Sequence, residues 1–172
     1  MNAASLQHDL QTLGYALVEK LVPDRDLAAL RAEVDELLAA APHGGGVRNV
    51  LGKSGKLREL ANTGPPARLA AASLGPSARA MKLTVFDKTA NANWKVPWHQ
   101  DLTIAVARRQ EIEGFGPWSI KDGTVCSVPA GAGMLMSPLL LHASSPSVAP
   151  GRRRVLHFEY SAVELPEGLS WV

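Results

Sequence analysis

The stretch NWKVPWHQDLTIAV, residues 93–106, contains the short motif His99-x-Asp101. Side chains two positions apart on a β-strand point to the same face of the sheet. If this stretch is a strand, the imidazole of His99 and the carboxylate of Asp101 point to one side, while Trp98 and Gln100 point to the other. An imidazole and a carboxylate on one side suit a divalent metal ion. The stretch therefore predicts a strand that carries part of a metal site.

Short motifs of this kind also arise by chance, and the chain contains a second one, His157-x-Glu159. The alternative interpretation of either pair is two polar residues on a solvated strand face. A metal site needs a further ligand, and the candidate is His142, which ends the apolar run GMLMSPLLLH (133–142). Its alternative is a polar strand terminus, or a core histidine satisfied by a backbone carbonyl group. Two histidines and one carboxylate together form the facial triad of non-haem iron(II) sites.

The run RRRVLHFEYSA, residues 152–162, predicts a strand with two different faces. One face carries Arg153, Val155, His157 and Glu159, and the other carries Arg154, Leu156, Phe158 and Tyr160. The second face is expected to receive the helices, so that Arg153 points inward, where a guanidinium binds a carboxylate through two parallel hydrogen bonds. Ser144 shares the face of His142. We expect Arg152 and Arg154 in a solvated turn. Lys88, near the end of its strand, could reach a substrate or co-substrate carboxylate, but we expect it on the surface.

The order of the expected elements predicts an α+β fold that is mainly β, in a single domain spanning residues 1–172. Residues 1–80 read as mainly helical, with apolar residues at helical spacing in 25–41 and one or two short helices in 56–75. Between them, 43–56 reads as a flexible connection. Residues 81–172 are rich in short β segments and contain the metal motifs. These expected strands lie at 81–88, 101–107, 124–130, 133–142 and 152–162.

The composition excludes several classes of protein. The chain has 172 residues, of which 46% are hydrophobic and 20% charged, as in a globular domain, and the net charge of +2 predicts no nucleic-acid partner. The single cysteine, Cys126, leaves no intrachain disulfide and suits a reducing compartment. Because the chain starts without a signal-peptide pattern and has no apolar run of membrane-spanning length, we expect a cytoplasmic protein with no membrane partner.

Three stretches together resemble the phytanoyl-CoA dioxygenase family of iron(II)- and 2-oxoglutarate-dependent oxygenases. They are DKTANANWKVPWHQDL at 87–102, FGPW at 115–118 and VPAGAGMLMSPLLLHASSPSVAPGRRRVLHFEYSA at 128–162. The resemblance also touches the N-terminal helix and RNVL at 48–51. It implies a double-stranded β-helix, or jelly roll, with the N-terminal helices packed on the larger sheet.

The same resemblance implies a function and a set of site residues. His99, Asp101 and His142 would bind Fe(II), and Arg153 with Ser144 would bind the distal carboxylate of the co-substrate 2-oxoglutarate. The implied reaction consumes O2, hydroxylates a small organic substrate, and releases succinate and CO2. Trp94, Trp98 and Trp118 are expected to pack or to line the cavity.

The chain departs from the family in one respect, because only 41 positions separate Asp101 from His142 (142 minus 101). A complete roll needs most of four strands there, at about five or six residues each, and 111–123 reads largely as loop. We therefore expect an incomplete roll with exposed sheet edges, through which copies of the chain can associate. Two alternatives stay open: a catalytically impaired jelly-roll protein that binds a metal or ligand, and a cupin-like enzyme whose metal site uses His157 and Glu159.

Overall fold

The computed structural model describes residues 3–41, 44–101, 125–148, 152–165 and 167. The helices are α1 (Ala3–Leu13), α2 (Asp24–Ala39), the short 3-10 helix η1 (Val50–Gly52), α3 (Gly55–Thr63) and α4 (Pro65–Leu74). The strands are β1 (Tyr15–Val18), β2 (Gly46–Val47), β3 (Arg79–Lys88), β4 (Val96–His99), β5 (Gly133–Met136), β6 (His142–Ser144) and β7 (Arg153–Ser161). The expected strand at 101–107 lies, from 102 onward, outside the described residues, as does the FGPW stretch.

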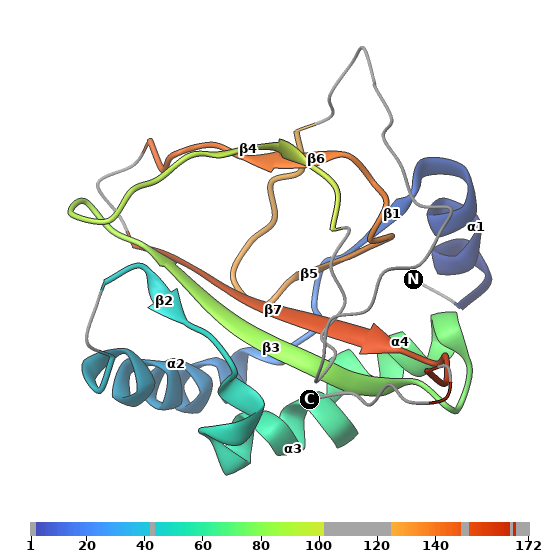
Figure 1. Cartoon of the computed structure of the whole chain (residues 1–172), viewed down its shortest axis with the longest axis horizontal. Coiled ribbons are helices and arrows are strands. Elements are labelled where there is room, and N and C mark those ends of the chain that lie inside the picture. Colours follow the sequence, from blue (N-terminus) through green and yellow to red (C-terminus); the bar gives the residue numbers. More distant parts are fainter. Residues whose placement is uncertain (1–2, 42–43, 102–124, 149–151, 166, 168–172) are drawn as a thin grey trace.

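The described strands form three antiparallel sheets, with orders β2-β3-β7, β4-β6 and β1-β5. Figure 1 shows the long strands β3 and β7 crossing the molecule side by side, with α2, α3 and α4 on one side and the β4-β6 pair on the other. This arrangement of helices and sheets confirms the expected mixture of α and β structure. It is consistent with the two facing sheets of a jelly roll.

The core lies between the β2-β3-β7 sheet, which we call the central sheet, and the helices. Leu83 and Val85 of β3 are fully buried, and they pack with residues of α2, β2, η1 and α3. From β7, Leu156 and Phe158 pack against the same cluster. The hydroxyl of Tyr160 donates to the carbonyl oxygen of Ala61 at 2.7 Å, and burial raises the pKa of Tyr160 to about 12. The side of β7 that faces the helices is therefore the one predicted from the alternation of residues in 152–162.

From residue 44 onward, the segment 43–56 is not the flexible connection that its glycines suggest. Gly46 and Val47 form β2 against β3, and Val50 in η1 is fully buried. Gly46 has φ +142°, and a Cβ atom there would lie 2.0 Å from the carbonyl oxygen of Val85, so only glycine fits this close approach. The glycine thus serves close packing on the sheet.

Ser54 ends this segment by starting α3 and joining it to α2. Its Oγ accepts a hydrogen bond from the Leu57 N–H at 3.1 Å, which is an N-cap, and donates to Glu33 at 2.6 Å. This hydrogen bond is the main cause that lowers the pKa of Glu33, and the Lys56 ammonium adds to it. One serine side chain therefore fixes two helices under the sheet.

The other expected elements agree in part with the structure. The expected helix over 25–41 is confirmed as α2, and the stretch 56–75 contains two helices, with Pro65 at the start of α4. The expected strand at 124–130 is wrong, because residues 125–130 belong to no strand. No helix within the described ranges is both long enough and apolar enough to cross a membrane.

Candidate metal centre

Three of the predicted site residues come together where β4 and β6 pair. His99 and His142 are direct partners across the two strands, and their ring centroids lie 4.2 Å apart. Asp101 follows β4 by two residues, and its backbone N–H donates to the carbonyl oxygen of Pro138 at 2.8 Å. That bond holds the chain just beyond β4 against the turn that precedes β6. The strand pairing therefore places His142 beside a motif that lies 41 positions earlier in the sequence.

Both imidazole rings are oriented in the same way. The Nδ1 atom of His99 lies 2.9 Å from the carbonyl oxygen of Pro97, and Nδ1 of His142 lies 2.9 Å from that of Leu140. A carbonyl group only accepts hydrogen bonds, so in the neutral ring Nδ1 carries the proton and Nε2 presents its lone pair. A backbone carbonyl at the far nitrogen is the usual partner that fixes a metal-binding histidine.

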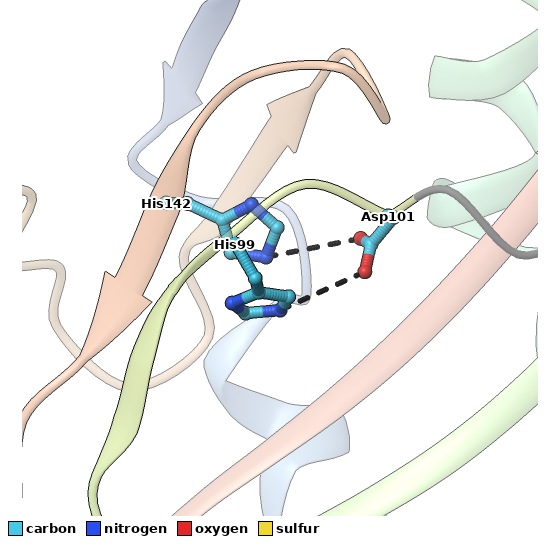
Figure 2. Close-up of side chains that lie close together, drawn as sticks. All are labelled: His99, Asp101 and His142. Atoms are coloured by element: carbon cyan, nitrogen blue, oxygen red, sulfur yellow. Dashed lines mark ion pairs between the residues drawn. The ribbon is translucent and has the colours of Figure 1, made fainter. Parts of the chain in front are cut away.

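The Nε2 atoms of both histidines point at Asp101, as Figure 2 shows. They lie 3.8 Å from its two carboxylate oxygens, His99 Nε2 from Oδ1 and His142 Nε2 from Oδ2. All three ligand atoms lie within 4.8 Å of one another, and all three side chains are partly buried. Two neutral imidazoles and one carboxylate are a donor set that fits Fe(II) and leaves further coordination positions open.

A pair of cations lies at the end of β3 and the start of β7. They are on the side of the central sheet that faces the β4-β6 pair, away from the helices, which we call the inner side (Figure 1). Lys88 and Arg153 are direct cross-strand partners. The Arg153 guanidinium donates to Ser144 Oγ at 2.8 Å and to the Ser145 carbonyl oxygen at 3.1 Å. The Lys88 ammonium donates to Ser144 Oγ at 3.0 Å and to the Ser145 carbonyl oxygen at 2.9 Å. The Ser144 hydroxyl, two residues from His142, is thus shared by two positive charges.

Lys88 was expected on the surface, and this expectation is wrong, because only 3% of the residue is exposed. Its Nζ also lies 5.2 Å from the centre of a Trp94 ring, a cation–π contact. Burial lowers the pKa of Lys88, and repulsion from Arg153 lowers it further. Within the described residues, neither Lys88 nor Arg153 forms a salt bridge with a carboxylate. Two cations without such a partner favour the binding of an anion.

A signal for Lys88 was present in the sequence. In MKLTVFDK, residues 81–88, the apolar Leu83 and Val85 alternate with Thr84, Phe86 and Lys88. Since Leu83 and Val85 face the helices, Lys88 had to face inward. Only the pairing of β3 with β7 shows that it meets Arg153 there.

Arg152 and Arg154 do not lie in a solvated turn, which corrects the expectation for both. Arg152 forms two hydrogen bonds with the buried carboxylate of Asp87, and Arg154 forms an ion pair with Asp35 of α2. Their guanidinium groups therefore point to the helix side of the central sheet, whereas that of Arg153 points to the inner side.

The second sequence motif has a different environment. Glu159 forms an ion pair with Lys82 at 2.6 Å, and the ring of His157 stacks on Phe86 with centroids 5.9 Å apart. Burial lowers the pKa of His157, although the nearby Glu159 and Asp101 carboxylates partly oppose this. Among the described residues, the group able to hold a metal contains neither His157 nor Glu159. The structure thus gives the cupin-like alternative no metal ligands from this motif.

Solved structures with a similar fold include non-haem enzymes. The epimerase SnoN, in complex with Fe3+, α-ketoglutarate and nogalamycin RO, matches with a TM-score of 0.76 and 17% identity over 92% of this chain and 82% of SnoN. SnoK, a non-haem α-ketoglutarate-dependent carbocyclase from nogalamycin biosynthesis, matches with a TM-score of 0.75 and 12% identity over 93% and 85%. EvdO2 from Micromonospora carbonacea var. aurantiaca matches with a TM-score of 0.64 and 14% identity over 95% and 94%.

No protein-family model and no curated protein sequence matches the chain. At the identities of the structural matches, the likeness shows the fold. The chain therefore shares the fold of SnoN and SnoK, two non-haem α-ketoglutarate-dependent enzymes. Its His99, Asp101 and His142 group is of the kind that could hold such a metal.

Proposed function

We propose that the chain is an Fe(II)- and 2-oxoglutarate-dependent dioxygenase that hydroxylates a small organic substrate. One observation carries the proposal: two histidines and one carboxylate bring their ligand atoms within 4.8 Å of one another, and one of them, His142, shares β6 with a serine that contacts two cations. Among the described residues, neither cation forms a salt bridge with a carboxylate. A metal site next to an anion site suits a metal-bound dicarboxylate co-substrate.

His99, Asp101 and His142 would hold the iron, whose chemistry when bound is the activation of O2 for oxidation of the substrate. The balanced reaction converts the substrate, 2-oxoglutarate and O2 into the hydroxylated product, succinate and CO2. The role of the two Nδ1 contacts with Pro97 and Leu140 is to hold both rings with Nε2 free.

Arg153, Ser144 and Lys88 would bind the distal carboxylate of 2-oxoglutarate. The guanidinium offers parallel N–H groups, the ammonium adds a second positive charge, and the shared hydroxyl holds both in place. A buried ammonium gains most from an arriving anion, because its own burial has removed it from water.

We propose hydroxylation as the reaction and the phytanoyl-CoA dioxygenase family as the family of this chain. The resemblance to phytanoyl-CoA dioxygenases supports hydroxylation, whereas structures with the same fold include an epimerase and a carbocyclase. We also propose that the protein is cytoplasmic and binds neither nucleic acid nor a membrane.

The test is turnover of 2-oxoglutarate labelled at the carboxyl group that leaves as CO2. Purified protein with Fe(II) in air should release labelled CO2 and form an equal amount of succinate, at the slow rate expected without the primary substrate. Omitting iron, or replacing His142 by alanine, should abolish both. Folded protein that yields neither product in the presence of iron and air contradicts the proposal.

A second candidate is a catalytically impaired jelly-roll protein that binds a metal or ligand. The observation that favours it is Val155, which lies on the inner side of β7 and is 47% exposed, as expected for an open roll. This candidate predicts binding of metal and 2-oxoglutarate without turnover. Association through open sheet edges would accompany it, so light scattering should detect a dimer or larger oligomer.

A further inference from the structure

Asp87 is a buried carboxylate next to the anion site but on the opposite side of the sheet. It is 4% exposed, and it directly precedes Lys88 on β3. Its two oxygens accept hydrogen bonds from Arg152, Oδ1 from Nε at 2.7 Å and Oδ2 from Nη2 at 2.8 Å. This two-bond contact fixes the direction of the guanidinium as well as its distance.

The same carboxylate also reaches the arginine on the other side of Arg153. Arg154 is its cross-strand partner, with Nε 3.5 Å from Asp87 Oδ1. Arg152 and Arg154 are the two chain neighbours of Arg153. One buried carboxylate therefore contacts the residues before and after the arginine that faces inward.

Neighbouring residues on a strand point to opposite faces, so holding one fixes the direction of the next. Asp87 and Arg154 face the helices, whereas their neighbours Lys88 and Arg153 face Ser144. The contacts of Asp87 thus determine where the two strand ends lie relative to each other, and with them the spacing of the two inward cations.

We propose that Asp87 is a positioning residue for 2-oxoglutarate, which sets the spacing of Lys88 and Arg153 by holding Arg152 and Arg154 behind them. This inference rests on the function proposed above. It assigns to Asp87 a part in co-substrate binding although the carboxylate lies on the helix side and does not face the bound anion.

Two effects of Asp87 oppose each other, and their signs make the inference testable. As a nearby negative charge, Asp87 weakens the attraction between the cations and an incoming dicarboxylate. If only this charge mattered, its removal should tighten the binding of the dicarboxylate. As a positioning group, its removal should loosen the cation pair and weaken binding. The inference requires that the second effect be the larger one.

Asp35 provides a matched control. Its carboxylate contacts the same two arginines, Arg152 and Arg154, but its side chain is 55% exposed and it belongs to α2. Asp35→Asn removes the same charge from the same cluster but leaves the contacts of Asp87 with Arg152 and Arg154 in place.

The experiment uses protein loaded with Mn(II), which needs no exclusion of air. Calorimetric titration measures the dissociation constant of 2-oxoglutarate, and electron paramagnetic resonance measures that of Mn(II). Asp87→Asn should weaken 2-oxoglutarate binding about ten- to a hundredfold, as outer partners of a binding group do, and leave Mn(II) binding unchanged. Asp35→Asn should leave both within about twofold, since exposed pairs contribute little.

Unchanged or tighter 2-oxoglutarate binding in Asp87→Asn overturns the inference. So does a loss of Mn(II) binding in this variant as large as its loss of 2-oxoglutarate binding. The third contradicting result is a loss of 2-oxoglutarate binding in Asp35→Asn as large as that in Asp87→Asn. If Asp87→Asn does not fold, Arg152→Lys, which keeps the charge but not the two-bond geometry, must show the loss instead, and normal binding by it overturns the inference. Wild-type protein that binds neither Mn(II) nor 2-oxoglutarate refutes the proposed function itself. Wild-type binding with no difference between variants refutes only the role of Asp87.

Discussion

On the side that faces the helices, strands β3 and β7 contribute apolar side chains to the core, whereas the opposite side of the same two strands carries two cross-strand pairs of charged residues. Leu83, Val85, Leu156 and Phe158 fill the first side. Lys88 with Arg153 and Lys82 with Glu159 occupy the second. Since successive residues alternate between the two sides, one stretch of sequence can serve both stability and the proposed anion binding. The two sides should therefore respond differently to mutation.

The largest difference in stability should come from truncating one apolar residue on each side. Leu83→Ala removes a fully buried side chain and should lower the free energy of unfolding by about 2–5 kcal/mol. Val155→Ala, on the half-exposed inner side, should cost less than about 1 kcal/mol. Urea denaturation measures both. Equal losses would mean that the inner side is packed as tightly as the core.

Lys88→Met should separate stability from binding. Removing the buried ammonium should weaken 2-oxoglutarate binding about tenfold or more, yet raise the free energy of unfolding by about 1 kcal/mol, because the cost of burying the charge disappears. The control is Lys82→Met on the same side, which leaves Glu159 unpaired and should bring no gain in stability. Calorimetry and urea denaturation test the two variants. If Lys88→Met is destabilised and binds normally, the lysine is structural.

On the helix side, Tyr160→Phe should cost about 1 kcal/mol, since the variant leaves the Ala61 carbonyl oxygen without this partner. Titrating the wild type by absorbance should also show Tyr160 ionising only near pH 12, as its raised pKa requires. A variant as stable as the wild type would show that water replaces the hydroxyl at no cost.

The smallest effect should come from the pH dependence of His157. Burial lowers its pKa in the folded state, so below the ordinary value of 6.5 the unfolded chain binds a proton that the folded chain does not. The free energy of unfolding should therefore fall as the pH decreases through 6.5 and level off below the lowered pKa. His157→Phe, which can keep the stacking on Phe86, should reduce this slope. An unchanged slope would assign it to other groups.

The sequence predicted those features that depend on a local period. The alternation of 152–162 placed Leu156 and Phe158 against the helices and Arg153 inward, because a strand has a side-chain period of two. The H-x-D spacing likewise predicted that His99 and Asp101 point to one place, and they do, although β4 ends at His99 and Asp101 lies beyond the strand. These features need no knowledge of the partner strand.

The features that the sequence did not predict depend on pairing between distant segments. Lys88 is buried because β3 ends beside Arg153, 65 positions later (153 minus 88), and Arg152 turns toward the helices because Asp87 lies there. The sequence indicated that Gly46 belongs to a flexible loop. In the structure, a glycine is required there because the backbone lies close to Val85. Such contacts follow from tertiary packing, which overrides the local character of a segment.

The most direct test of the account is a spectroscopic one that needs no primary substrate. Metal-free protein is mixed anaerobically with Fe(II) and 2-oxoglutarate, and the visible charge-transfer band of the iron-bound 2-oxo acid is recorded. We predict a band in the wild type, none in His142→Ala, and in Arg153→Ala a band that requires about tenfold or more 2-oxoglutarate, as expected for losing a charged hydrogen bond. Folded wild-type protein without the band, or His142→Ala with an unchanged one, would contradict the assignment of the metal centre.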